Sequence, residues 1–467
     1  MAGLRLAPPA PHPGERKRTV FTRPSLAKLL VAITLVLSFD VLAVEPACYP
    51  LEVLPAEHKQ TTDPETGAEL IYLTTDPADD WNLHWSVRAW LADDSLILFE
   101  TARDGGGIMG YLVETGELVR IHTPEGRLDD ATAAINRNSV YARRGDEILE
   151  LALEFDVSSE PENEPSEVFA QERLIARLPA HEDGRPTRLT ENSDSTTLAI
   201  GVRNVPVDGD DGAVIYTIDI ASGALEELCR LRHPPGHPGG GNHVQWSFTN
   251  PYLLSFAGRV GPDSDVAGPR RGSADPTDYE NRWQKLWVVD VREGVPRNVY
   301  EAAEGELVTH PAWWVDDQKL FTGGTRQEPP VESHVKAVNI YTGHARVMGA
   351  GAWWPHGDPE ELTRHSWWHT SGSEDGRWIV ADNFHGDIML FEGATTRPHM
   401  LTRNHRTYGR GRHCHPGWDN RGKQVVFASD RLGSQNVCVA AVPGALQEQA
   451  AYAANNPSGL SEPPPDE

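Results

Sequence analysis

The sequence predicts an all-β chain folded as a seven-bladed β-propeller, with a ring closed by its N- and C-terminal segments. The composition includes 14 Trp, 42 Gly and 36 Pro in 467 residues, and no long run has the apolar spacing of an amphipathic helix. Short apolar runs bounded by Asn, Asp and Gly recur along the chain, as expected for hairpins. Four strands per unit, at a period of roughly 40 to 65 residues, is typical of propeller blades.

The strand and turn pattern places seven blades along the chain. The final unit, 413–442, has first strands but no closing hairpin, whereas 63–74 resembles a closing hairpin with no strands before it. Combining the two ends in one blade removes the free sheet edges of the ring. The other six units are expected near 84–123, 130–180, 185–231, 240–303, 306–350 and 365–402.

The N-terminus has the pattern of a secretory signal. Three basic residues, 16–18, precede an apolar run over Leu29–Phe39, and small residues at 41–43 offer a cleavage point. The run is shorter than the roughly 20 residues that span a bilayer, so an uncleaved anchor is the less favoured alternative and no stable span remains after cleavage. We therefore expect a periplasmic or extracellular protein with a signal peptide at 1–43, a propeller at 44–446 and a disordered acidic tail at 447–467.

The charge of the chain excludes nucleic acid as a partner. The formal net charge is −26, and removal of residues 1–43 takes away six basic and two acidic groups, which gives −30. A surface this acidic repels polyanions unless a locally basic pocket receives them.

Four cysteines are few for an exported chain of this length, and their pairing is open. Cys414 lies between two histidines of the sequence. On a strand its side chain would point away from both, so a packing role is favoured over metal ligation.

Four histidines are spaced as if they occupied equivalent positions in four blades. They are seven residues ahead of the turn residues Asn250, Asp317, Gly376 and Gly422, and they are His243, His310, His369 and His415. Repeats around an axis would bring these imidazoles together. His413 precedes His415 by two residues, so both would face the same side of one strand. Such a set suits a transition metal or a catalytic base; the alternative is inner-strand histidines that hydrogen-bond neighbouring blades.

These segments resemble oligogalacturonate lyases from about Asp63 to Val442. The resemblance is carried by Gly-Asn-His243-Val-Gln-Trp-Ser, Thr-His310-Pro-Ala-Trp-Trp, His369-Thr-Ser-Gly-Ser-Glu-Asp-Gly and His413-Cys-His415-Pro-Gly-Trp. It implies a seven-bladed propeller that binds Mn²⁺ and cleaves oligogalacturonides by β-elimination. It further implies that His310, His413 and His415 are metal ligands and that His243 is the base.

Two positions depart from the pattern of this family. Arg410 stands where the family has a glutamine ligand, so either another group such as His369 completes the metal site or the metal is absent. The catalytic arginine of the family has no clear counterpart, and Arg259 or Arg203 is the candidate replacement.

The functional hypothesis is a carbon–oxygen lyase acting on an acidic oligosaccharide, with an oligogalacturonide as first choice. A base beside the weakly acidic C5–H and a cation at the carboxylate are the groups that such an elimination needs. His84 is a second base candidate, against the alternative of a packing histidine. Ulvan lyases, which resemble this chain in a general way, make another uronate glycan the alternative substrate. Propellers similar to the TolB domain, which bind without chemistry, are the alternative class.

Overall fold

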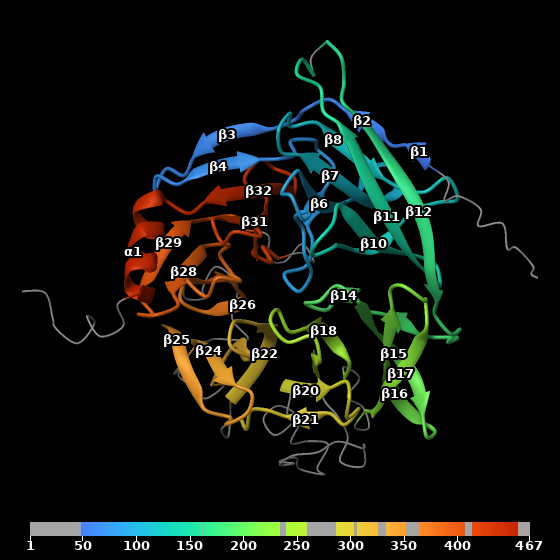
Figure 1. The fold of residues 1–467 in the computed structure, drawn as a ribbon. Coiled ribbons are helices and arrows are strands. Elements are labelled where there is room, and N and C mark those ends of the chain that lie inside the picture. The colour runs from blue at the N-terminus through green and yellow to red at the C-terminus, as the bar shows by residue number, and fades with distance from the viewer. Residues whose placement is uncertain are drawn as a thin grey trace, which may run out of the picture. The chain divides into compact units, whose positions relative to one another are not determined.

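The computed structural model describes residues 48–161, 163–233, 240–258, 286–302, 306–325, 333–351, 364–406 and 413–455. These residues form seven antiparallel sheets arranged in a ring, which confirms the predicted seven-bladed propeller (Figure 1). The predicted signal peptide lies outside the described residues. All described strands belong to one compact unit.

The first three blades follow one another along the chain in the predicted order. Blade 1 has β5 (Asp80–Asn82), β6 (Leu96–Thr101), the short 3-10 helix η1 (Arg103–Gly105), β7 (Gly107–Leu112) and β8 (Leu118–Ile121). Blade 2 has β9 (Asp129–Ala133), β10 (Ser139–Arg144), β11 (Glu147–Asp156) and β12 (Glu167–Arg177). Blade 3 has β13 (Arg185–Pro186), β14 (Thr190–Glu191), β15 (Thr197–Val207), β16 (Asp210–Asp219) and β17 (Leu225–Arg232).

Blades 4 to 6 are four-stranded meanders. Blade 4 has β18 (Asn242–Trp246), β19 (Leu253–Ala257), β20 (Leu286–Asp290) and β21 (Arg297–Asn298). Blade 5 has β22 (Glu306–Trp313), β23 (Gln318–Thr325), β24 (Ser333–Asn339) and β25 (Ala345–Gly351). Blade 6 has β26 (Trp367–Gly372), β27 (Trp378–Asn383), β28 (Ile388–Glu392) and β29 (Pro398–Thr402).

Blade 7 joins the two ends of the chain, as predicted. It contains β30 (Gly417–Trp418), β31 (Gln424–Ser429) and β32 (Asn436–Ala441), followed by β4 (Glu69–Tyr72) and β3 (Lys59–Thr62) from the N-terminal side. Asp63, in the turn between β3 and β4, anchors this closure. Its Oδ2 accepts hydrogen bonds from Oγ1 of Thr402 at 2.7 Å and from Nη1 of Arg431 at 3.0 Å.

Three features of the chain ends were not predicted. β1 (Cys48–Pro50) pairs with β12, and β2 (Glu52–Leu54) pairs with β8, so both cover outer edges of blades 2 and 1. The segment 444–455 forms helix α1 (Gly444–Asn455), although the disordered tail was expected from residue 447. The helix is held because Ala450 and Ala453 are buried and Nε2 of Gln447 donates to the carbonyl of Gly422 at 3.0 Å. No helix within the described ranges is long and apolar enough to cross a membrane.

Apolar side chains fill the spaces between neighbouring blades. Trp313 packs between blades 4 and 5, Trp367 between blades 5 and 6, and Trp378 between blades 6 and 7. Each indole is under 2% exposed. Because β14, β18, β22 and β26 lie on the axial side of their blades (Figure 1), the packed blades fix the positions of side chains that reach the centre.

The four cysteines lie within the described residues, and they form no disulfide there. Cys414 is buried in the apolar cluster between blades 6 and 7, which agrees with the predicted packing role.

Candidate functional site

A β-bulge in the first strand of blades 4 and 5 turns a histidine toward the axis. His243 and Val244 together stand opposite Phe256, and His310 and Pro311 stand opposite Phe321. The φ angles are +50° at His243 and +47° at His310. Left-handed backbone is uncommon outside glycine, and strain of this kind is retained mainly where a structure needs a particular side-chain direction.

Of the other two predicted histidines, His415 has the same backbone position as His243 and His310, whereas His369 does not. His415 also has a left-handed φ of +47° and precedes the paired residue Gly417 by two, as His243 precedes Gln245. In blade 6 the first bulge residue is Trp368, and His369 is the second. The difference arises because β26 has one more residue between its bulge and its hairpin. Ser373, which begins that hairpin, follows the first bulge residue by five positions, whereas Ser247 and Trp314 follow theirs by four.

The structure brings together every candidate histidine at the axis. His369 is central to the group: its ring centroid lies 4.4 Å from that of His310, 4.3 Å from that of His415 and 5.1 Å from that of His413. The rings of His84 and His243 are 5.2 Å apart, and those of His243 and His310 are 6.0 Å apart. We call these six residues the axial histidines: His84, His243, His310, His369, His413 and His415.

An indole that sequence reasoning missed lies among the axial histidines. The ring centroid of Trp85 is 5.0 Å from that of His243, 5.3 Å from His310, 4.8 Å from His369 and 5.1 Å from His415. It reaches the axis because the first strand of blade 1 is interrupted: β5 ends at Asn82, and strand pairing resumes only at Trp90. The intervening segment 83–89 carries both His84 and Trp85 inward.

Burial keeps the axial histidines neutral. It lowers the pKa of His243 to about 3, with smaller contributions from the positive charges of Arg188 and Lys319. The pKa of His413 is lowered by the same cause, and the pKa values of the remaining four lie well below the usual range, again mainly because of burial. Neutral imidazoles have a lone pair available for a proton or a metal ion. Among the described residues, Nδ1 of His243 and Nδ1 of His310 are buried without a hydrogen-bond partner.

An arginine in blade 3 supplies positive charge beside the histidines, and it too was missed. Arg188 lies two residues before Thr190, the place that His243 has relative to Gln245. After burial, its charge is the largest cause that lowers the pKa values of both His84 and His243. Arg188 also lines a cavity of about 370 Å³ between blades 1 and 2, where its Nη2 lies 3.3 Å from Oε1 of Glu100.

The arginines named from sequence are less well placed. Arg203 lies in β15, and its charge contributes less to the low pKa of His243 than the charges of Arg188 and Lys319. Arg259 and Arg410 lie outside the described residues.

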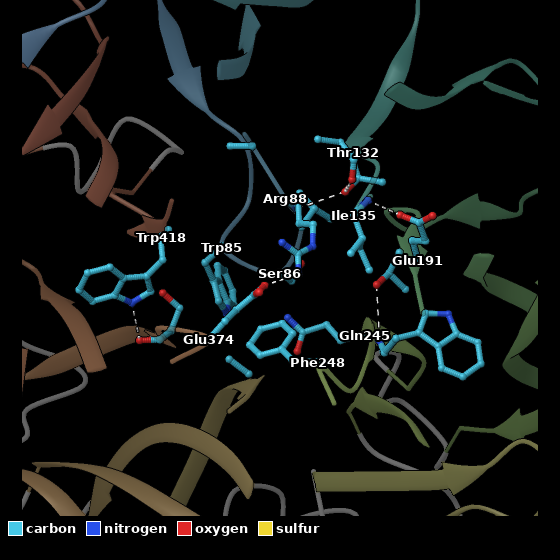
Figure 2. A pocket seen from close by; sticks show the side chains of 18 of the residues that line it. Trp85, Ser86, Arg88, Thr132, Ile135, Glu191, Gln245, Phe248, Glu374 and Trp418 are labelled. Carbon is cyan, nitrogen blue, oxygen red and sulfur yellow. Dashed lines mark hydrogen bonds and ion pairs between the residues drawn. The ribbon is translucent and has the colours of Figure 1, made fainter. Parts of the chain in front are cut away.

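A second cavity, of about 70 Å³, lies beside Trp85 (Figure 2). The lining includes Trp85, Arg88, Glu374 and Trp418 but none of the axial histidines. An ion pair between Arg88 and Glu374 links blade 1 to blade 6 there.

The axial histidines provide the donor chemistry of a transition-metal site. Imidazole nitrogen is a good ligand for Mn, Fe, Ni or Zn, and the partnerless Nδ1 of His310 is one such donor. As the side chains stand, however, no three His, Cys, Asp or Glu residues in the described ranges are arranged to hold an ion. One reason is that Trp85 fills the space among four of the rings.

Fold and site together define a seven-bladed propeller with a histidine cluster on its axis. Its fold is similar to that of two oligogalacturonate lyase structures. One structure, an oligogalacturonate lyase in complex with manganese, is 16% identical with a TM-score of 0.62, over 86% of this chain and 99% of that chain. A second, the oligogalacturonate lyase of Vibrio parahaemolyticus, is 15% identical with a TM-score of 0.59, over 86% and 100%. No protein-family model matches the sequence, and no curated protein is significantly similar to it.

Proposed function

We propose that this chain is a lyase that cleaves uronic-acid oligosaccharides by β-elimination at the axial histidines, with an oligogalacturonide as the first-choice substrate. The observation that carries the proposal is the set of six neutral imidazoles from five blades, placed beside the cation of Arg188. A propeller that only binds has no need to bury so many imidazoles at one point. The fold shared with two oligogalacturonate lyases supports the same activity.

The proposed elimination uses two groups of this chain. Arg188 pairs with the uronate carboxylate, which makes the proton on C5 more acidic. A nitrogen of His243 takes that proton, and the C5–H bond is replaced by an N–H bond. The electron pair forms the C4–C5 double bond while the C4–O bond breaks, so the leaving sugar departs with its oxygen and gains a proton from solvent.

His243 is better suited to be the base than His84. The Nδ1 atom of His84 lies 2.5 Å from the hydroxyl of Ser86, which occupies one of its two nitrogens. The Nδ1 atom of His243, by contrast, is buried without a hydrogen-bond partner in the described part of the chain. We therefore assign His84 a supporting place in the same cluster.

Manganese is the metal that we propose for the site, because the similar lyase structure contains it. His310, His413 and His415 would hold it, with His369 as a further donor. Bound there, the ion would supply additional charge to polarise the uronate carboxylate.

An absorbance assay for the unsaturated uronate product tests this function. The full chain is incubated with oligogalacturonides and, separately, with ulvan oligosaccharides, after chelation and with or without added manganese. We expect a rise in ultraviolet absorbance with oligogalacturonides. A rise with ulvan alone would move the substrate to that glycan. No rise with either, together with saturable binding of an oligosaccharide, would instead indicate a binding propeller.

Replacement of Arg188 by glutamine should reduce kcat/KM. Loss of one charged hydrogen bond to the carboxylate corresponds to about 1.5–3 kcal/mol, or roughly a 10- to 100-fold decrease. Steady-state kinetics on the active oligosaccharide measure it. Arg203→Gln is the matched control, since Arg203 is a half-buried arginine of the same blade that we do not place at the substrate. Equal losses in the two variants would contradict the assignment.

A further inference from the structure

A buried carboxylate, that of Asp382, forms hydrogen bonds with two of the axial histidines. Asp382 lies in β27, directly opposite the bulge formed by Trp368 and His369, and it is 1% exposed. Its Oδ1 accepts the backbone N–H of His369 at 2.7 Å. Its Oδ2 lies 2.9 Å from Nδ1 of His369 and accepts the backbone N–H of His415 at 3.3 Å.

These contacts determine how the His369 ring is held. The backbone and the ring of His369 are bonded to one carboxylate, so the ring has little freedom to rotate. An ionised carboxylate only accepts hydrogen bonds, and therefore the bonded Nδ1 carries the ring proton. The other nitrogen, Nε2, is on the opposite edge of the ring, directed away from β27, and retains its lone pair.

The same carboxylate also joins two blades. His369 belongs to the first strand of blade 6, whereas His415 precedes the first strand of blade 7. The ring centroids of these two residues are 4.3 Å apart, the smallest separation among the axial pairs given above. A bond to the His415 amide sets the height of that residue along the axis relative to His369.

We propose that Asp382 is a positioning residue that fixes His369 as the Nδ1–H tautomer and holds His415 beside it, so that the Nε2 lone pair of His369 is presented to the axial site. Histidines that bind metals or move protons are commonly oriented by a carboxylate in this way. The chemical role of the Nε2 lone pair rests on the proposed function. The orientation of the His369 ring does not depend on that function.

The test is the protonation state of His369 in the full chain and in Asp382→Asn. The variant keeps the volume of the side chain. Its amide oxygen can still accept the His369 backbone N–H, but its NH₂ group donates toward Nδ1 and makes that atom an acceptor. In protein with ¹⁵N-labelled histidine at pH 8.5, we expect a protonated Nδ1 in the natural chain, because this atom lies 2.9 Å from Oδ2 of Asp382. In Asp382→Asn the proton should move to Nε2, so the two nitrogen signals exchange ranges.

Asp387→Asn is the matched control. Asp387 is another fully buried carboxylate of blade 6, bonded to Arg364 rather than to an axial histidine. His369→Gln identifies the signals by their loss. An unprotonated Nδ1 in the natural chain would overturn the proposal, as would an exchange of signals in Asp387→Asn or its absence in a folded Asp382→Asn.

Kinetics separate this inference from the proposed function. If the lyase proposal holds, Asp382→Asn should lower kcat at least 10-fold with little change in KM, because the substrate contact of Arg188 remains. If no uronate oligosaccharide is cleaved but the nitrogen signals exchange as expected, the positioning role stands and the proposed function fails. Unchanged kcat together with unchanged nitrogen signals would reject the positioning role.

Discussion

His243→Gln should lower kcat by about 10²- to 10⁴-fold, the range that a positioned general base contributes. Glutamine retains a polar side chain of similar length, but its amide cannot take a proton at neutral pH. KM should change less, since Arg188 still binds the carboxylate. The measurement is the initial rate of ultraviolet absorbance on the active oligosaccharide, with circular dichroism to confirm that the variant is folded.

Two other histidines make this result specific. His84→Gln should lower kcat less than His243→Gln, because one nitrogen of His84 is already engaged by Ser86. His405→Gln removes a buried neutral imidazole outside the axial cluster, where it contacts Thr402 and Ser429, and should leave kcat unchanged. If His84→Gln is the more damaging variant, the roles of the two histidines are reversed. A loss of rate in His405→Gln equal to that in His243→Gln would show a general effect on the fold.

The fold could be predicted because its signals are local. Turn residues such as Asn250 and Gly376 punctuate apolar runs, and each hairpin is specified within a few residues of sequence. The closure of the ring could also be predicted, since 63–74 lacked strands that the C-terminal unit supplied. Helix α1 was missed because its stability comes from packing of Ala450 and Ala453 against blades rather than from its own apolar pattern.

The histidine cluster could be predicted in outline because repeats on a ring place equivalent residues together. The rest of the site depends on register, which the sequence does not display. Arg188 has the position of His243 in its own blade, but it is an arginine, so a search for histidines passes over it. Asp382 stands opposite His369 only after strands β26 and β27 are paired with their bulge. Trp85 reaches the axis because strand pairing in blade 1 is interrupted, and no turn residue in the sequence marks that interruption.

The unfolding free energy of the metal-free protein should fall steeply with pH between about 6.5 and 5. Each axial histidine has a folded pKa below its unfolded value of about 6.5, so in this window the unfolded chain takes up protons that the folded chain does not. The folded state with buried, neutral histidines therefore loses stability relative to the unfolded chain as the pH falls. Asp382 acts in the opposite sense: its pKa of about 7 exceeds the unfolded value, so the folded state binds one proton more.

The six axial histidines and the buried His405, less this one carboxyl, leave at most six protons, and each is worth about 1.4 kcal/mol per pH unit. The upper limit of the slope is thus about 8 kcal/mol per pH unit, comparable to the whole stability of a typical domain at roughly 5–15 kcal/mol. We expect unfolding near pH 5. Ordinary surface carboxylates titrate near pH 4, so relief of repulsion in this acidic chain comes too late to offset the loss.

Urea denaturation with a chelator present, at pH values from 8 to 5, measures this slope. His243→Gln should reduce it by about 1.4 kcal/mol per pH unit, because one titrating group is removed from the cluster. His405→Gln should do the same, since burial likewise lowers the pKa of His405 to about 3. Both variants should therefore reduce the pH slope of stability, but only His243→Gln should lower kcat. The comparison separates the effect of burying an imidazole on stability from the role of that imidazole in catalysis. A stability that is flat from pH 7 to 5 would mean that the axial histidines titrate in the folded protein as they do in the unfolded chain, near pH 6.5, and that burial does not keep them neutral.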